Sequence, residues 1–155
     1  MAGKIDAHLQ DLGITLPEPA TPVANYVPYV KTGNLIFVSG QVPVEGGELK
    51  YVGKLGADVS LEDGQAAARL CGINIISQLK AALDGDLDRV VRIVKLGGFV
   101  NSTPDFAQQP QVVNGVSDLM VEVFADKGKH ARAAVSAGAL PSGVAVEVDA
   151  VVEVA

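Results

Sequence analysis

The sequence predicts an α+β fold in which two helices pack against one mixed β-sheet, preceded by a short helical arm. Two segments, 60–85 and 110–124, carry apolar residues at three- and four-residue steps, the spacing of an amphipathic helix. Shorter segments rich in β-formers lie before, between and after them. The resulting order, ββ(β)αβαββ, places the helices in one layer and the strands in another.

We divide the chain into an N-terminal arm, residues 1–25, and one α+β domain, residues 26–155. In the arm, apolar residues recur at helical spacing over 4–12, and Gly13 is placed to end this helix. The segment 16–22 contains three prolines and is expected to be extended. We expect the arm to pack on the domain as an appendage.

The domain is expected to open with a β-hairpin. Residues 26–31 are rich in β-formers, 32–34 form a tight turn, and 35–38 are apolar on both faces, as in a buried strand. Ser39-Gly40-Gln41 ends this second strand. A weaker strand is expected over 49–52.

Two helices are predicted next. Ser60 is placed to cap the first, with acidic residues in its first turn. Cys71 lies on the apolar stripe of this helix, so we expect a small buried side chain there and not a reactive thiol. The second helix is expected to begin near Pro110, a residue suited to the first turn, and to reach Phe124.

Three strands complete the prediction. Residues 90–100 form a β run in which alternate positions are expected to face the core, and a short apolar strand begins at Arg132. The last strand, 144–154, alternates strictly. One face carries Val144, Val146, Val148, Ala150, Val152 and Val154. The acidic residues share the other face: Glu147, Asp149 and Glu153.

Arg132 and Glu147 are the most informative charged residues. An arginine in an Ala/Val strand loses hydration unless it is paired, and its guanidinium suits two-pronged binding of a carboxylate. If 139–140 is the turn of a hairpin, Glu147 faces Arg132 on the neighbouring strand at a similar height. The two residues are then either a structural ion pair, which spacing alone slightly favours, or a carboxylate clamp beside an acid–base group.

Two further positions have two interpretations each. Tyr26 is a strand aromatic, which more often packs than binds a ligand. Ser39-Gly40, at the end of an apolar strand, can expose a backbone N–H to a ligand, although an ordinary turn is the commoner case.

Composition disfavours several classes of function. The net charge is −6 and the chain has no basic run, which argues against nucleic acid as a partner. With one cysteine and two histidines, His8 and His130, no disulfide or metal site is expected, and no phosphate-binding or dinucleotide motif points to a cofactor. No apolar run approaches the about 20 residues that cross a bilayer, and no leader opens the chain, so a soluble cytoplasmic protein is expected.

Three segments together resemble the RidA/YjgF family, the reactive-intermediate (enamine/imine) deaminases. The resemblance runs from Tyr26 to the C-terminus, and its most specific parts are Ser-Gly-Gln-x-Pro at 39–43 and the Arg…Leu-Pro…Glu spacing. The matching segments are Tyr26 with Gly33–Pro43, Gly98–Asn101 with Asp105-Phe106, and Arg132–Val135 with Leu140-Pro141 and Val144–Ala150.

The resemblance implies a chorismate-mutase-like (bacillus-type) fold assembled as a homotrimer, with three sites in clefts between subunits. It implies hydrolysis of small 2-imino acids to 2-keto acids and ammonia without a cofactor. By matching position, Arg132 would hold the substrate carboxylate and Glu147 would orient or activate water. Tyr26, Ser39 and Gly40 would line the pocket, with Gly40 offering its backbone N–H.

The chain departs from the family pattern in places. Ala134 occupies a pocket position where family members often carry cysteine, so a thiol has no role there. Residues 136–139 lack the usual valine and charged residue, and the arm and the stretch 45–59 are additional. These differences indicate a divergent branch with an altered cleft rim.

The main alternative is a non-catalytic trimer that binds small carboxylates, such as 2-keto acids, through Arg132. A ribonuclease or translation inhibitor is disfavoured by the acidic balance. A chorismate mutase is disfavoured because a dianionic substrate calls for several arginines, and only Arg132 of the chain's four lies in the motif.

Overall fold

The computed structural model describes residues 3–155. Its helices and strands follow the predicted order. The weaker strand expected over 49–52 is shorter and lies at Glu48–Leu49, where it pairs with one additional two-residue strand. In chain order they are α1 (Lys4–Asp11), β1 (Tyr29–Thr32), β2 (Leu35–Gln41), β3 (Val44–Glu45), β4 (Glu48–Leu49), α2 (Leu61–Ala82), β5 (Val90–Asn101), α3 (Gln109–Phe124), β6 (Ala131–Ala137) and β7 (Val146–Val154).

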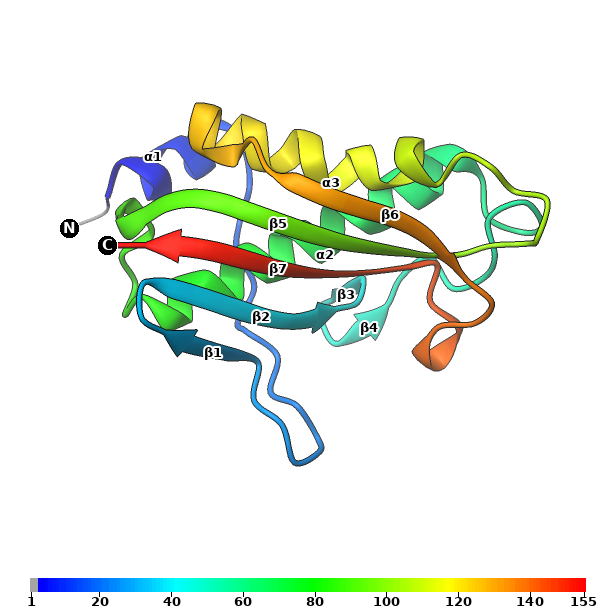
Figure 1. Cartoon of the computed structure of the whole chain (residues 1–155), viewed down its shortest axis with the longest axis horizontal. Helices are drawn as coiled ribbons and strands as arrows, with labels where there is room; N and C mark the ends of the chain where they lie inside the picture. The colour runs from blue at the N-terminus through cyan, green and yellow to red at the C-terminus, as the bar shows by residue number, and fades with distance from the viewer. Residues whose placement is uncertain (1–2) are drawn as a thin grey trace.

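The main sheet has the strand order β1-β2-β7-β5-β6, and β3 and β4 pair separately. Only β5 and β6 run parallel; the other neighbours are antiparallel. Both long helices cover the same face, with α2 against β2 and β7 and α3 against β5 and β6 (Figure 1). The predicted α+β architecture is confirmed. The opposite face, here called the open face, carries no helix.

The predicted β1–β2 hairpin is present. Thr32 pairs with Leu35, and Gly33 has a φ of 58°, a left-handed conformation that glycine adopts without a steric penalty. Ile36 is fully buried against the helices, whereas Phe37 is 45% exposed on the open face. The expectation that this strand is buried on both faces is therefore wrong for a single chain, because helices cover one face only.

The helix predictions are confirmed in detail. The Ser60 hydroxyl accepts a hydrogen bond of 3.1 Å from the N–H of Asp63, which caps α2. Cys71 is fully buried, and burial raises the pKa of its thiol well above the usual value, so the side chain acts as a small apolar group. A Cβ at Gly115 would clash with the carbonyl oxygen of Gln65, so this glycine lets α3 approach α2 closely.

Strand β5 does not alternate as predicted. Its register with β7 shifts twice, between Val90 and Arg92 and between Ile93 and Lys95. Each shift is a β-bulge, in which two residues oppose one on the partner strand. As a result Val90 and Ile93 face the core three residues apart, and Val91 is 40% exposed.

Strands β6 and β7 are not the two arms of a hairpin, so this expectation is wrong. Strand β5 lies between them: Phe99 pairs with Glu147 on one side and with Val135 on the other. Arg132 pairs with Leu96, a core residue, and so lies on the helix side of the sheet. Since residues of β7 alternate between faces as predicted, Glu147 lies on the open face.

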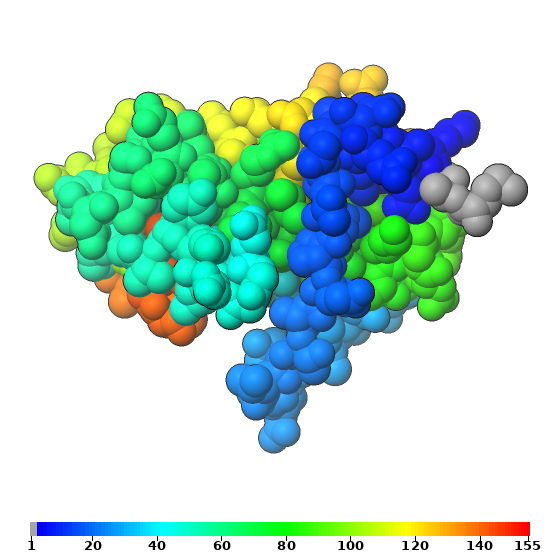
Figure 2. Space-filling view, turned by 180° about the vertical axis from the view of Figure 1, so that it is seen from behind, coloured from blue at the N-terminus to red at the C-terminus, as the bar shows by residue number. Residues whose placement is uncertain are grey.

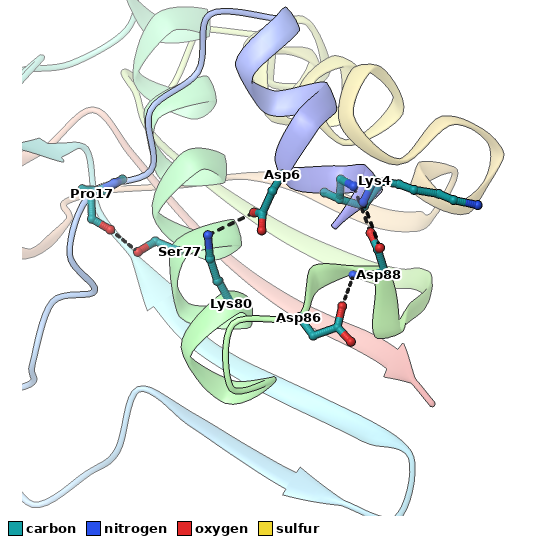
Figure 3. A network of polar contacts seen from close by, with 8 residues as sticks. Lys4, Asp6, Pro17, Ser77, Lys80, Asp86 and Asp88 are labelled. Atoms are coloured by element: carbon teal, nitrogen blue, oxygen red, sulfur yellow. Dashed lines mark hydrogen bonds and ion pairs between the residues drawn. The ribbon is translucent and has the colours of Figure 1, made fainter. Parts of the chain in front are cut away.

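The arm packs on the helices as expected. Figure 2 shows it running across the helix layer into a segment that projects from the body. The carboxylate of Asp88 accepts two backbone N–H groups at the start of α1, at 2.9 Å each. Farther along, Ser77 donates to the carbonyl of Pro17 at 2.6 Å, and Lys80 pairs with Asp6 at 3.0 Å (Figure 3). These contacts fix the start of the segment that leads to Tyr26.

The stretch 45–59 crosses the end of the sheet. Val52 forms a bridge with Val144, and the Lys54 ammonium donates to the Asn101 amide oxygen at 2.7 Å. The stretch is therefore tied to the ends of β5 and β7. Among residues 3–155, no helix combines the length and the apolar character that crossing a bilayer requires.

Candidate functional site

The six residues proposed from the sequence fall into two groups on one chain. Tyr26, Ser39, Gly40 and Glu147 lie around the end of β2 and the start of β7; we call them the acidic half. Arg132 and Ala134 lie on β6, next to α3; with their α3 contacts we call them the arginine half. Strand β5 separates the two halves, which lie toward opposite faces of the sheet.

The acidic half contains a β-bulge. Val38 pairs with Ala150 and Gln41 pairs with Val148, so Ser39 and Gly40 together oppose the single residue Asp149. A bulge leaves its extra residue outside the regular ladder. The bulge thus leaves the backbone of Ser39-Gly40 irregular, at the position where an N–H facing a ligand was predicted from the sequence. The N–H of Ser39 donates to the carbonyl of Pro28.

Gly40 makes room for Glu147. A Cβ at position 40 would lie 3.0 Å from both the Cδ and the Oε1 of Glu147, closer than side chains normally approach. Gly97, on the other side of β7, gives the same room to Asp149. The two carboxylates can therefore lie against the sheet with glycine on either side of β7.

Glu147 is a charged group without a counter-ion. Within the described residues, no ion pair or hydrogen bond reaches its carboxylate. Partial burial raises its pKa above the ordinary value, and the nearby charge of Asp149 raises it further. A carboxyl group with a raised pKa accepts a proton more readily than an exposed one.

Tyr26, Ser39 and Gly40 line one surface cavity of about 200 Å³, whose other wall is the end of the arm. Ser39 holds that wall: its hydroxyl donates to the carbonyl of Val27 at 2.8 Å, and its N–H donates to that of Pro28 at 2.9 Å. Tyr26 is 58% exposed at the mouth. The cavity is large enough for a few non-hydrogen atoms and open to one side.

In the arginine half, α3 holds the guanidinium of Arg132. Nη1 donates to the amide oxygen of Asn114 at 2.8 Å and to the hydroxyl of Ser117 at 3.0 Å, and Nη2 donates to the carbonyl of Pro110 at 3.3 Å. All three acceptors are neutral. No carboxylate of residues 3–155 lies within 4.0 Å of the guanidinium.

The structural ion pair between Arg132 and Glu147 is therefore absent from the single chain, and the interpretation that spacing slightly favoured is wrong there. Ala134 lies two residues after Arg132 on the same face and packs against the core, partly buried. Its methyl group contributes apolar surface and no hydrogen bond.

Asn114 and Ser117 were not predicted from the sequence. Their signal was present: two polar residues three apart on a helix share one face, and a helix that precedes an Arg-bearing strand can turn that face toward it. Nothing in the sequence alone shows that α3 packs along β6 in the required register.

Comparison with known proteins places this architecture in a family. The family model described as "YjgF/chorismate_mutase-like, putative endoribonuclease" matches residues 6–153, arm included. Protein TCP17 of Trypanosoma cruzi is 52% identical over 153 residues, which cover 98% of this chain and 95% of that protein.

Two crystal structures superpose closely on the whole chain. Protein Atu1372 of Agrobacterium tumefaciens, of unknown function, has a TM-score of 0.92 and 48% identity, covering 97% of this chain and 92% of that one. A Shewanella oneidensis protein described as a "putative endoribonuclease" has a TM-score of 0.94 and 36% identity, covering 98% and 100%. With its α+β fold, the order of its motifs and a family match over nearly its full length, the chain belongs to the YjgF/RidA family.

Proposed function

We propose that this protein hydrolyses small 2-imino acids to 2-keto acids and ammonia with its own side chains, at sites between the subunits of a homotrimer. One observation carries the proposal. A single chain presents an oriented guanidinium, Arg132, and a partly buried carboxylate, Glu147, and neither has a counter-ion among residues 3–155.

The two charges point to a site shared between copies. Arg132 faces the helix side and Glu147 the open face, with β5 between them, so one chain does not bring them together. In a cyclic oligomer each subunit presents two different patches, and one patch meets the other patch of its neighbour. On the open face, the apolar side chains of Phe37 and Val135 are each 45% exposed. Exposed apolar surface of this kind favours contact with another subunit.

The chemistry requires little of the protein beyond placement. Arg132 binds the substrate carboxylate, which fixes the iminium carbon beside Glu147. Glu147 takes a proton from water as the water oxygen bonds to that carbon. Glu147 then gives this proton to the nitrogen. As the carbon–nitrogen bond breaks and ammonia leaves, Glu147 takes the remaining hydroxyl proton, and the carbon keeps the oxygen as a ketone. Glu147 then releases this proton to solvent. The raised pKa of Glu147 suits these proton transfers.

The test is an imine-hydrolysis assay. An amino-acid oxidase or a threonine dehydratase generates the imine, and semicarbazide competes for it. We expect the wild type to lower the semicarbazone signal and Arg132→Ala to leave it unchanged. Arg69→Ala is the matched control, because Arg69 pairs with Glu122 on the surface of the helix layer at 3.1 Å and should behave as wild type. No effect of the wild type on imines from several amino acids would sink the proposal.

A non-catalytic trimer that binds small carboxylates is the second candidate, favoured by the neutral hydrogen bonds that orient Arg132 for an anion. Glu147→Gln separates the two. For a deaminase, this variant loses hydrolysis and still binds 2-oxobutyrate. For a simple binder, the wild type already binds 2-oxobutyrate without hydrolysing any imine. The net charge of −6 disfavours a third candidate, cleavage of RNA.

A further inference from the structure

We propose that Ser117 and His130 form a one-directional hydrogen-bond relay that positions Arg132, leaving the Nε and Nη2 edge of the guanidinium for the substrate carboxylate. The inference rests on the proposed function, since it concerns the carboxylate that Arg132 would bind. Ser117 and His130 are positioning residues: they act through Arg132 and do not touch substrate.

The relay has three bonds. His130 Nδ1 lies 2.6 Å from the carbonyl oxygen of Gly128, His130 Nε2 lies 2.8 Å from Ser117 Oγ, and Ser117 Oγ lies 3.0 Å from Arg132 Nη1. The turn after α3 supplies Gly128, the loop before β6 supplies His130, and α3 itself supplies Ser117. Three successive parts of the chain are therefore linked by hydrogen bonds that end at one guanidinium nitrogen.

The direction of the relay follows from which atoms can donate. A carbonyl oxygen only accepts, so Nδ1 of His130 must carry the hydrogen. In a neutral imidazole, Nε2 is then an acceptor, and the hydroxyl hydrogen of Ser117 points to it. The lone pairs of Ser117 Oγ are left for Arg132, whose Nη1 can only donate. Without His130, the Ser117 hydroxyl would be free to rotate.

The relay also determines which edge of Arg132 is free. A guanidinium has five N–H groups; in the described residues two on Nη1 and one on Nη2 are engaged, by Asn114, Ser117 and Pro110. The N–H of Nε and the second N–H of Nη2 remain. In this proposal, the Nη2 hydrogen that points away from Nε is the one donated to Pro110. The other Nη2 hydrogen and that of Nε then point the same way and match the two oxygens of a carboxylate.

The relay fixes Arg132 without neutralising it. Every group that holds the guanidinium is uncharged in this arrangement, and the relay ends on a backbone carbonyl. A carboxylate in the place of Asn114 would orient Arg132 equally well but would compete with the substrate for its charge. The arrangement therefore leaves the charge of Arg132 available to an anionic ligand.

The test uses Ser117→Ala, Ser117→Thr and Ser136→Ala. In Ser117→Ala we expect the KM for the imino acid and the Kd for 2-oxobutyrate to rise about tenfold, because one hydrogen bond to a charged group contributes a free energy of this size. The kcat should stay within about twofold of wild type. Ser117→Thr keeps the hydroxyl and should restore both constants. Ser136→Ala is the control: on the same strand as Arg132, it removes the 2.7 Å contact with Ser102 and does not touch the relay.

A second measurement tests the direction of the relay. Imidazole ¹⁵N shifts of neutral His130 should show hydrogen on Nδ1 and a lone pair on Nε2; the opposite tautomer would overturn the relay. Unchanged constants in Ser117→Ala, beside a wild type that binds and hydrolyses, would overturn the relay alone. A wild type that neither binds 2-oxobutyrate nor hydrolyses imines would overturn the proposed function, and the relay with it.

Discussion

The arginine half and the acidic half differ in the hydrogen-bond partners that they give to an unpaired charge. In the arginine half, three hydrogen bonds from Arg132 to neutral groups of α3 set the orientation of the guanidinium. In the acidic half, no donor among residues 3–155 reaches Glu147; a glycine gives its carboxylate room, and partial burial raises its pKa.

The difference matches the two tasks. A group that binds a carboxylate must keep its charge and its orientation, so neutral acceptors are suitable partners. A group that moves protons must change charge easily, and a hydrogen-bond donor on the carboxylate would stabilise the ionised form and lower the pKa. Each half thus lacks the feature that would hinder its proposed role.

The largest expected effect comes from mixing two variants, each of which is defective in one half. Arg132→Ala and Glu147→Gln should each be inactive alone, because every site then lacks one group. Unfolded together in equal amounts and refolded, they should regain about one quarter of the wild-type activity, since each site draws its two groups from different subunits. The measurement is the imine assay on the refolded mixture.

One control and one contradicting outcome accompany this experiment. Arg132→Ala refolded with Arg132→Met should stay inactive, because no subunit then supplies the guanidinium. Complete inactivity of the Arg132→Ala and Glu147→Gln mixture, with trimers present by sedimentation, would place both groups in a site within one chain.

A smaller effect should follow from crowding Glu147. In Gly40→Ala the new methyl group meets the end of a flexible side chain, so the fold should persist while the carboxylate moves by a few tenths of an ångström. We expect kcat to fall about tenfold, because misplaced catalytic groups lose much of their effect. Gly138→Ala is the matched control, since nothing lies within 4 Å of a Cβ at that glycine. Equal activity of the two variants would contradict the role of Gly40.

The two halves should respond to mutation with opposite signs of stability. Arg132→Ala removes hydrogen bonds of a charged group and should lower the free energy of unfolding by about 2 kcal/mol. Glu147→Gln should raise it at neutral pH. Its pKa is higher in the folded state than the ordinary 4.5, so wild-type stability is greatest below that value and falls as the pH rises through the folded-state pKa.

Thermal unfolding at fixed protein concentration tests this contrast. The Tm of Glu147→Gln should match that of wild type at about pH 4 and exceed it at about pH 7. A variant that is less stable than wild type at neutral pH would mean that Glu147 has a stabilising partner in the assembly.

The smallest expected effect concerns the arm, which leads into Tyr26 and lines the cavity of the acidic half only. Ser77→Ala removes the 2.6 Å hydrogen bond to Pro17 and should lower the free energy of unfolding by about 1 kcal/mol. The KM should rise by less than about threefold, and binding of 2-oxobutyrate at the arginine half should not change. A large loss of carboxylate binding would show that the arm also supports Arg132.

Local patterns determined much of this protein. The Ser60 cap, the turn at Gly33, the apolar stripe containing Cys71 and the alternation of β7 all depend on residues within a few positions of each other, so the sequence alone predicts them correctly. The order of the motifs from Tyr26 onward also indicated the family, which the comparisons confirm.

The tertiary structure decided how the charged residues are arranged. A hairpin between β6 and β7 was the simplest expectation for neighbouring strands, but β5 pairs with both and separates Arg132 from Glu147. The parallel β5–β6 pair, the bulges in β5 and β2, and the packing of α3 along β6 depend on contacts between residues far apart in the chain. Local propensity carries no record of such contacts, and a bulge shifts every later side chain to the other face. The neutral partners of Arg132 and the glycine beside Glu147 therefore became visible only in the folded chain.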